Sequence, residues 1–449
     1  MVSVSRRSRW LVLAIVFSSP FSAIGEVVSV IAGIASDVET TVQAALDLLR
    51  KGDVSSARKR LSRIENVPDL PHPEIILADM MIAIGRPADA QSVLDPLSLG
   101  QEGTFDLHLA FAKLAIAQQR WFDGWTHIRL ADKAERPSTW SSEHKEKMEV
   151  VLAQTQATIC EGRGDWKRLK SIGEPFAKRS PPDAKLMALL GHAEFSLGNV
   201  DRAIKYLEKV RELVPGLDPP MLVIAQWHDS KSDSEQTEAA FRSAIAQYQD
   251  ADLDESKLRF ARWLLWNNRP DEAEPLLSGV PAGDDKRADQ RAFLRASSAR
   301  MRGDLAAAKS ILTPLHQKEP TAFPVSNLLA LIAIESSEEV DRSLAFELAK
   351  TNCNNQPNVA EAWSTLGWVL YKRGDLKSAH ESLMRSAQAG QISRDTAYFI
   401  ATVKSRMGQT AAAAELGNAA VSANGPFHYG QSKSNSKSSP IPPAPSAAP

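Results

Sequence analysis

The feature that most constrains this chain of 449 residues is an internal repeat. A turn-forming residue, usually Gly, recurs at steps of 33 to 37 residues, with one longer step of 45 between Gln119 and Gly164. Gly, Asn and Ser suit a turn between two helices because they tolerate backbone conformations that other residues avoid. The turn positions are Gly52, Gly85, Gln119, Gly164, Gly198, Ser232, Asn268, Gly303, Ser337, Gly374 and Gly408. A period of this length indicates stacked supersecondary units rather than a row of separate globular domains.

Residues at fixed distances from these turns support the repeat. Seven residues before the turn, all eleven units carry Ala or Gly. Nine residues after it, nine units carry a large apolar residue, Phe346 in repeat nine among them, whereas repeats four and eleven carry Gly173 and Gly417. Five residues after it, seven units carry Ala, and Leu169 and Gly124 stand there in repeats four and three. Small residues let two helices approach closely, and we expect the large one to fill the space toward the next pair.

Each unit therefore corresponds to two helices of about 12–15 residues around a short turn, because its apolar residues recur at helical intervals. The pattern predicts an all-α protein, an α-solenoid of antiparallel helix pairs with about eleven repeats over residues 37–427. Residues 132–149 supply the extra length between repeats three and four, as a longer loop or a helix extension.

Two units resemble tetratricopeptide repeats (TPRs). One unit has Leu370 in place of the family's usual Tyr and otherwise carries Trp363, Leu366, Gly367, Gly374, Ala379 and Leu383. The other unit has Glu194 at the Tyr position and otherwise carries Leu190, Gly191, Gly198, Ala203, Leu207 and Pro215. The other units match the family less closely, but their register is kept. The resemblance implies a right-handed superhelix whose first helices line a concave groove that binds an extended peptide or a partner helix.

Candidate binding residues in such a groove are counted from the Ala or Gly that stands seven positions before the turn. They follow that residue by one position or lie about one helical turn from it. These candidates are Asp79, Lys113, His192, Arg262, Arg300, Trp368, Tyr371 and Tyr398. The resemblance does not extend to the clamp by which some TPRs bind chaperone carboxylate tails. Leu46, Ile75 and Leu109 stand where that clamp needs polar ligands, which argues against a cytosolic chaperone adaptor.

The two ends of the chain differ from the repeats. Residues 1–36 combine a basic start at Arg6, Arg7 and Arg9 with the apolar run 10–17, followed by the small-residue patterns 23–25 and 33–35. This combination predicts a cleaved signal peptide, with an uncleaved N-terminal membrane anchor as the alternative. Residues 428–449 are rich in Ser and Pro and predict a disordered tail.

Charge and motifs exclude several classes of function. Lys plus Arg total 53 and Asp plus Glu 54, so the chain lacks the basic excess of a nucleic-acid binder. Cys160 and Cys353 are two isolated cysteines, which we expect to be buried thiols rather than a disulfide or a zinc site. The sequence contains no metalloprotease, phosphate-loop or serine-hydrolase motif. We therefore expect a non-catalytic protein that binds no cofactor and no metal.

The hypothesis that follows is a protein–protein interaction scaffold, exported across or anchored in the cytoplasmic membrane. Its expected role is the assembly of cell-envelope or secretion components, with partner peptides or helices bound in the groove. One alternative is a TPR component of a polysaccharide-export or surface-assembly machine, and the least supported is an enzyme built on the repeats. In all three, membrane contact would come only through an uncleaved N-terminal segment.

Overall fold

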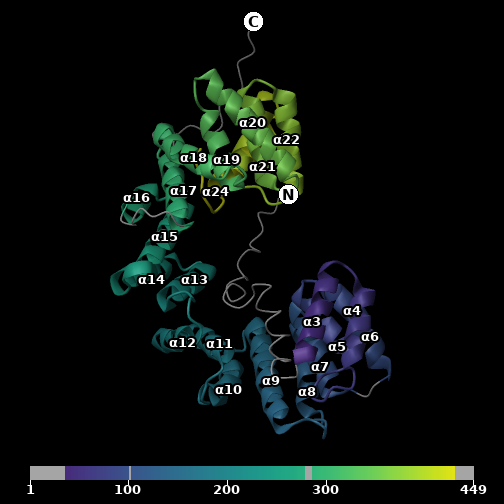
Figure 1. The fold of residues 1–449 in the computed structure, drawn as a ribbon. Helices are drawn as coiled ribbons and strands as arrows, with labels where there is room; N and C mark the ends of the chain where they lie inside the picture. Colours follow the sequence, from purple (N-terminus) through teal and green to yellow (C-terminus); the bar gives the residue numbers. More distant parts are fainter. Residues whose placement is uncertain (1–35, 101–102, 279–285, 430–449) are drawn as a thin grey trace. The chain divides into compact units, whose positions relative to one another are not determined.

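The computed structural model describes residues 36–100, 103–278 and 286–429, and within these ranges the chain forms helices and no strand (Figure 1). The chain divides within helix α14 into an N-terminal unit that ends at Ala240 and a C-terminal unit that begins at Phe241. The predicted targeting segment lies outside the described residues except for Ser36, and the predicted tail lies outside them except for His428 and Tyr429.

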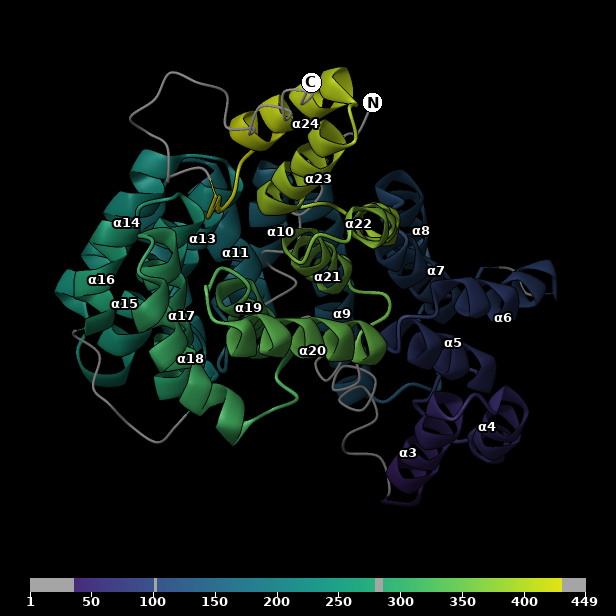
Figure 2. The same cartoon turned by 90° about the horizontal axis from the view of Figure 1, so that it is seen from above.

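The described helices form eleven consecutive pairs, as the repeat predicts, so the all-α solenoid is confirmed. The N-terminal unit contains α3 (Ser36–Arg50), α4 (Val54–Leu61), α5 (Pro73–Ala83), α6 (Pro87–Gly100), α7 (Phe105–Ala117), α8 (Trp121–Lys133), α9 (Ser142–Arg163), α10 (Trp166–Ala177), α11 (Ala184–Ser196), α12 (Val200–Leu213), α13 (Pro220–Ser230) and the start of α14 (Ser234–Gln247), with a short 3-10 turn η2 (Ser62–Ile64). The C-terminal unit continues with α15 (Asp250–Trp266), α16 (Pro270–Ser278), α17 (Lys286–Met301), α18 (Leu305–Lys318), α19 (Phe323–Ala333), α20 (Glu339–Asn355), α21 (Ala360–Lys372), α22 (Leu376–Ala389), α23 (Arg394–Arg406) and α24 (Thr410–Ser422). Figure 2 shows paired helices such as α23 and α24 lying side by side, in agreement with their contacts.

The turns between paired helices adopt the conformation that their residue types favour. Ten of the eleven predicted turn residues have positive φ, for example 92° at Gly374 and 59° at Asn268. Glycine has no Cβ to clash there, and Asn tolerates the conformation better than most residues. In several repeats an Asp follows the turn; the carboxylate of Asp375 accepts the backbone N–H of Ser378 and so caps α22. The Gly-Asp pair thus ends one helix and starts the next.

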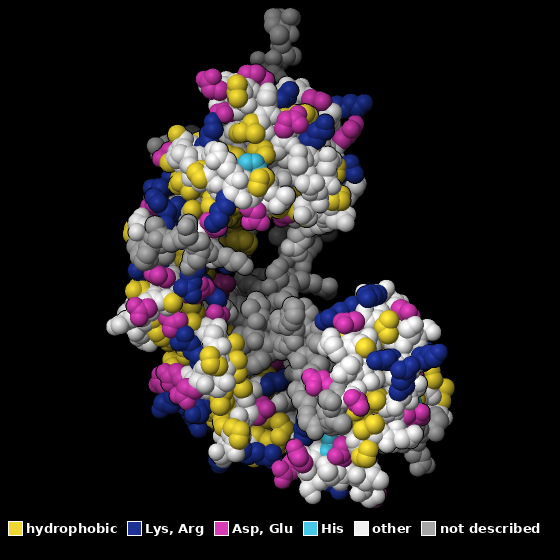
Figure 3. All heavy atoms as spheres, in the orientation of Figure 1, with side chains coloured by type: hydrophobic (Ala, Val, Ile, Leu, Met, Phe, Trp, Pro, Cys, Tyr) yellow, Lys and Arg dark blue, Asp and Glu magenta, His cyan; other side chains and the backbone are white. Residues whose placement is uncertain are grey.

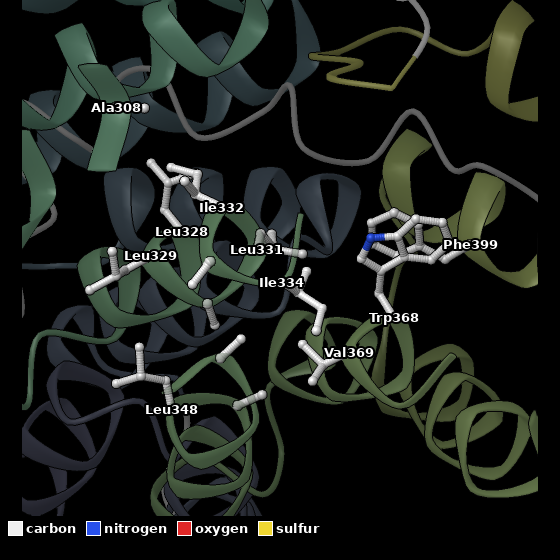
Figure 4. Close-up of a cluster of buried hydrophobic side chains, with 14 of the residues drawn as sticks. Ala308, Leu328, Leu329, Leu331, Ile332, Ile334, Leu348, Trp368, Val369 and Phe399 are labelled. Atoms are coloured by element: carbon white, nitrogen blue, oxygen red, sulfur yellow. The ribbon is translucent and has the colours of Figure 1, made fainter. Parts of the chain in front are cut away.

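The repeat positions form the core. All nine Ala residues seven positions before the turns have 0% exposure, and Gly191 and Gly367 at that position are also buried. In the C-terminal unit one apolar cluster runs from α17 to α23; Figure 4 shows its side chains, among them Leu329 and Leu348 from paired helices α19 and α20. Burial of apolar side chains along successive pairs is the force that holds such a stack together.

Two repeats differ from the expected register. The turn after α19 is longer, Ser337 does not adopt positive φ, and α20 begins only at Glu339. The fully buried small residues of this helix are therefore Ala345 and Ala349, and Phe346, predicted to fill the space between pairs, is half-buried. In repeat four the large and the small residue exchange places, because Leu169 stands where other repeats have Ala and Gly173 where they have a large apolar residue. Leu169 has 0% exposure, and a Cβ on Gly173 would lie 2.9 Å from Cγ of Leu190. The next pair thus fills the space that Gly173 leaves.

The extra length between repeats three and four is both a loop and a helix extension. α9 spans 22 residues, and the loop before it places Trp140 edge-on against Phe105 of α7, with ring centroids 5.4 Å apart. The backbone N–H of Ser141 donates to the carboxylate of Asp69 at 2.9 Å. The insertion is therefore packed against the preceding repeats of the same unit.

Glu194, which stands at the Tyr position of the TPR pattern, is a fully buried carboxylate. It has 0% exposure and lies 2.9 Å from Nζ of Lys170 and 3.3 Å from a guanidinium nitrogen of Arg202, while Nδ2 of Asn199 donates to it at 2.7 Å. Burial acts to raise the pKa of Glu194, but the hydrogen bonds from Lys170 and Asn199 outweigh it and the pKa is lowered. An ion-paired network replaces an aromatic side chain at this repeat position.

Candidate binding surface

In the N-terminal unit, the predicted residues Asp79 and Lys113 contact each other. Nζ of Lys113 on α7 donates to Oδ2 of Asp79 on α5 at 2.5 Å, so consecutive first helices are joined by an ion pair. Asp106 lies in the same electrostatic environment: burial raises its pKa to about 6, although the nearby charge of Lys113 lowers it. The two predicted residues therefore form a partly buried charged cluster.

His192 lies in an aromatic cluster of the same unit. Its ring stacks on Trp227 of α13 with centroids 4.8 Å apart and meets the edge of Trp166 at 4.9 Å. Nδ1 of His192 lies 2.6 Å from Oε1 of Glu161, at the end of α9. His192 thus connects three successive first helices, α9, α11 and α13, and is partly buried rather than freely exposed.

In the C-terminal unit three of the five predicted residues, Trp368, Tyr371 and Tyr398, form one group. Trp368 on α21 stacks on Phe399 of α23 with centroids 4.3 Å apart (Figure 4), and on Tyr371 at 5.1 Å. Its Nε1 donates to Oε1 of Glu335 at 2.9 Å, and Nζ of Lys372 donates to the other oxygen at 2.6 Å. Tyr398 lies at the border of this group, 6.0 Å from Trp368. The group is a largely buried aromatic cluster with one ion-paired carboxylate beside it.

Two of the candidate binding residues are buried. Trp368 has 3% exposure and Arg300 has 6%, whereas Arg262 is exposed. Their neighbours explain the difference, because the ring of Tyr429 lies 5.3 Å from the Trp368 ring and 5.3 Å from the guanidinium carbon of Arg300. A residue from the end of the described chain covers both positions.

The covering residue belongs to a short segment after α24, Gly425–Tyr429, here called the C-terminal segment. Asn268, at the turn after α15, donates from Nδ2 to the carbonyl of Gly425 at 3.0 Å and accepts the N–H of Phe427 at Oδ1 at 2.8 Å. Asp395 accepts the backbone N–H of His428 at 3.0 Å and lies 2.7 Å from its Nδ1. The segment therefore returns from the last helix pair to the first pair of this unit, a course that can be followed in Figure 2.

The side chains of the segment contact aromatic and charged residues. Phe427 has 5% exposure and lies under the guanidinium of Arg394, 4.7 Å from ring centroid to Cζ. The Tyr429 ring stacks on Tyr398 at 5.5 Å and its hydroxyl donates to Oε1 of Glu335 at 3.2 Å. Burial raises the pKa of Tyr429 well above its usual range, so this hydroxyl stays protonated and able to donate.

Asp395 is the charged centre of the segment's site. It is buried, and its carboxylate lies 3.9 Å from Arg300 as well as next to His428. Burial acts to raise the pKa of Asp395, but the charge and hydrogen bonds of His428 and the charge of Arg300 outweigh it, so the pKa is lowered. A carboxylate at the start of α23 is also favoured by the helix dipole.

The contacts of the C-terminal segment are the feature of this surface that sequence reasoning missed. The predicted boundary of the disordered tail at residue 428 cuts through it, although His428 and Tyr429 are held by the contacts above. The available signal was the pair of aromatic residues, Phe427 and Tyr429, next to a stretch rich in Gly, Ser and Pro.

A cavity of about 390 Å³ adjoins the segment. Every helix that lines it is the first of its pair, namely α15, α17, α19, α21 and α23, and Pro426 and His428 form part of its wall. Arg262 and Glu361 contribute charge to the lining, and Oδ1 of Asn327 has no hydrogen-bond partner among the described residues. These first-helix faces, with the segment's contacts, are here called the C-terminal groove.

Three further observations concern the thiols, the potential metal ligands and the apolarity of the described helices. Both thiols are buried as predicted, and burial raises the pKa of Cys160 to about 11 and that of Cys353 to about 12. No group of three potential metal ligands occurs among the residues that the structure describes. In that same part of the chain, none of the helices has the length and apolarity needed to cross a membrane. On the face shown in Figure 3, positive and negative side chains are interspersed over both units.

Comparisons with known proteins agree with the fold. The tetratricopeptide repeat family model matches residues 184–213, which cover α11 and α12. A tetratricopeptide repeat and J domain-containing co-chaperone, DNJ1, of Fusarium oxysporum f. sp. lycopersici is 28% identical over 151 residues, which are 33% of this chain and only 28% of that protein's length.

Two solved structures are also similar. The type IV pilus biogenesis factor PilW matches with a TM-score of 0.34 and 16% identity, over 45% of this chain and 91% of PilW. A chain of the APC/C hetero-tetramer Cut9–Hcn1 matches with a TM-score of 0.38 and 12% identity, over 92% of each chain. The family match lies at α11 and α12, and the same helix pair and left-handed turn recur on either side of it, so the fold is an α-solenoid of tetratricopeptide-like helix pairs.

Proposed function

We propose that this protein is a non-catalytic interaction scaffold that binds an extended peptide segment of a partner protein in its C-terminal groove. The observation that carries the proposal is the C-terminal segment itself. One short stretch of chain contacts residues of α17, α21 and α23 and the turns after α15 and α19. A surface that holds a peptide of its own chain has the shape and the polar groups to hold a peptide of another.

The contacts of the groove suit peptide recognition because different groove residues bind the main chain and the side chains of the segment. Asn268 and Asp395 bind backbone groups at Gly425, Phe427 and His428, which any extended peptide offers. The aromatic group around Trp368 provides apolar area for one side chain. Backbone hydrogen bonds give affinity in such complexes, and the side-chain pockets give specificity.

We further propose that the scaffold acts outside the cytoplasm, in the cell envelope, in the assembly of envelope or secretion components. The support is the basic and apolar composition of residues 1–36. N-terminal sequencing of the protein from its native cells tests this: cleavage predicts a mature start at Glu26 or Ser36, and an anchor predicts an intact chain in the membrane fraction. An intact chain in the cytosolic fraction would refute export.

Site-specific photo-crosslinking in intact cells tests peptide binding. A photoreactive amino acid at Arg262, which is exposed and lines the groove cavity, should trap a discrete partner protein. The same group at Glu381, exposed on the second helix α22, is the matched control and should trap much less of it. Equal trapping at both positions, or none at Arg262, would refute binding in this groove. Trp368 is unsuitable for this test because it is buried in the core.

A further inference from the structure

We propose that the C-terminal groove recognises a tyrosine carried on an extended segment of the partner, and that residues Gly425–Tyr429 occupy this groove in cis until the partner displaces them. The inference rests on the proposed function, since it names the ligand and the regulation of the same groove. Its basis is the set of contacts that the segment makes, because those contacts show which chemistry the groove accepts.

The recognition of tyrosine follows from the group around Tyr429. The ring lies against Tyr398, Trp368 and Phe399, with centroid distances of 5.5, 5.3 and 5.0 Å. These rings form an aromatic pocket, and aromatic pairs at such distances attract beyond simple burial. Phenylalanine would fill the same pocket, so the rings alone do not select tyrosine.

The hydroxyl provides the selection. It donates to Oε1 of Glu335, a carboxylate that also accepts from Trp368 and Lys372. The pair with Lys372 keeps the carboxylate in place beside the pocket, so it is preorganised as an acceptor. A hydrogen bond to a charged acceptor is worth more than a neutral one, and a ligand without the hydroxyl loses this bond and leaves Oε1 with Trp368 as its donor.

Displacement of the segment is structurally simple. Its backbone groups at Gly425, Phe427 and His428 bond to side chains of the groove and of Arg394, not to a helix or a strand. Leaving the groove therefore breaks no helical hydrogen bond within the described chain. A partner peptide that offers the same backbone groups and a tyrosine would restore each of these contacts.

Attachment makes the segment an effective competitor. Only Ala423 and Asn424 separate it from the end of α24, so its local concentration at the groove is high, on the order of millimolar for short connections. A free peptide of equal intrinsic affinity should thus bind the intact protein poorly and bind well once the segment's side chains are removed.

The test uses the full chain with Phe427→Ala and Tyr429→Ala, and a fluorescent peptide with the sequence of residues 423–431. Fluorescence anisotropy should show at least about tenfold tighter binding of this peptide to the double variant than to the unaltered chain. Replacing the peptide's tyrosine by phenylalanine should weaken binding to the double variant by about tenfold or more. Circular dichroism of the double variant confirms that the helices are retained.

A matched pair of turn substitutions locates the binding. Asn268→Gly preserves the left-handed turn, with φ of 59° in the native chain, but removes both side-chain hydrogen bonds to the peptide backbone. Gln119→Gly changes the equivalent turn position in the N-terminal unit, where φ is 57°. In the double-variant background the first change should weaken peptide binding at least about fivefold, and the second should leave it unchanged.

Three results would overturn the inference. Equal affinity for the unaltered chain and the double variant would show that the segment does not compete, and no binding to the double variant would show that it is not a ligand. Equal binding of the tyrosine and phenylalanine peptides would remove the selection by Glu335. None of these results alters the crosslinking outcome at Arg262, so the proposed function can stand or fall independently.

Discussion

Gly191 and Gly367 occupy the same repeat position but face different neighbours, which makes them a test of how the helix pairs pack. A Cβ on Gly191 would lie 3.4 Å from Cβ of Tyr206, 3.5 Å from the Ala203 carbonyl and 3.6 Å from Cγ of Leu207, all ordinary contacts. Gly191→Ala should therefore stabilise α11 by about 0.5–1 kcal/mol, because alanine has the higher helix propensity and loses less backbone entropy on folding.

Gly367→Ala should have the opposite sign. Its Cβ would lie 2.6 Å from Cγ and 3.0 Å from Cδ2 of Leu383, and 3.1 Å from the carbonyl oxygen of Ala379. Leu383 has 0% exposure, so it has no open space into which to turn, and α22 must move away from α21. Overpacking of this kind costs about 1–3 kcal/mol, against a gain of about 1 kcal/mol from helix propensity. The net effect is a destabilisation of up to about 2 kcal/mol.

Hydrogen exchange read by mass spectrometry is the suitable assay, because a stack of repeats can unfold in parts and a single melting temperature would average over them. Amides of α21 and α22 should lose about tenfold in protection with Gly367→Ala, since about 1.4 kcal/mol corresponds to a factor of ten. Amides of α11 and α12 should gain protection with Gly191→Ala. If Gly367→Ala raised protection as Gly191→Ala does, the close approach of α21 and α22 at this residue would not be what the glycine provides.

Three further predictions concern single buried groups. Glu194→Gln should lower the free energy of unfolding at pH 7 by about 2 kcal/mol, because it leaves the Lys170 charge without its buried partner. The pKa of Glu194 is lowered in the fold, so the native chain should lose this contribution as pH falls below about 4.5, whereas the variant should not. Urea titrations at several pH values can show this difference. Asp106→Asn should make the chain more stable at pH 7. Burial raises the pKa of the native carboxyl to about 6, so its contribution to stability is present at low pH and is lost as pH rises through that value. Thermal melts of the native chain between pH 4 and pH 8 would contradict this if they showed no such loss. Cys160 and Cys353 should react with a thiol reagent only after unfolding, and fast labelling of the native chain would refute their burial.

Local features of the fold followed from the sequence because each depends on residue type at a fixed spacing. A Gly such as Gly374 permits the left-handed turn, and an Ala such as Ala330 with 0% exposure permits close packing, so both can be located by counting. Counting fails where the spacing itself changes. The longer turn after α19 shifts the register of α20, so Ala345 and Ala349 are fully buried there, whereas Phe346 packs against the core cluster but is only half-buried.

The candidate site was predictable only in part, because its cover comes from a distant part of the chain. Arg300 and Trp368 were placed on the correct helices, but their burial depends on Tyr429, 129 and 61 residues further along. No periodic pattern connects these positions. Only the folded chain brings the first and last helix pairs of this unit to one short segment.

The position of Asn268 shows how a solenoid of this kind can change its binding properties without changing its packing. The turn between paired helices demands a left-handed residue, and Asn meets that demand nearly as well as Gly while adding an amide group. At Asn268 that amide reaches the groove and binds a peptide backbone at two atoms. Ten of the eleven repeats have such a left-handed turn residue, and where it is Gly an exchange to Asn adds both a donor and an acceptor. The turns thus form a row of interchangeable sites at which new contacts can be acquired one repeat at a time.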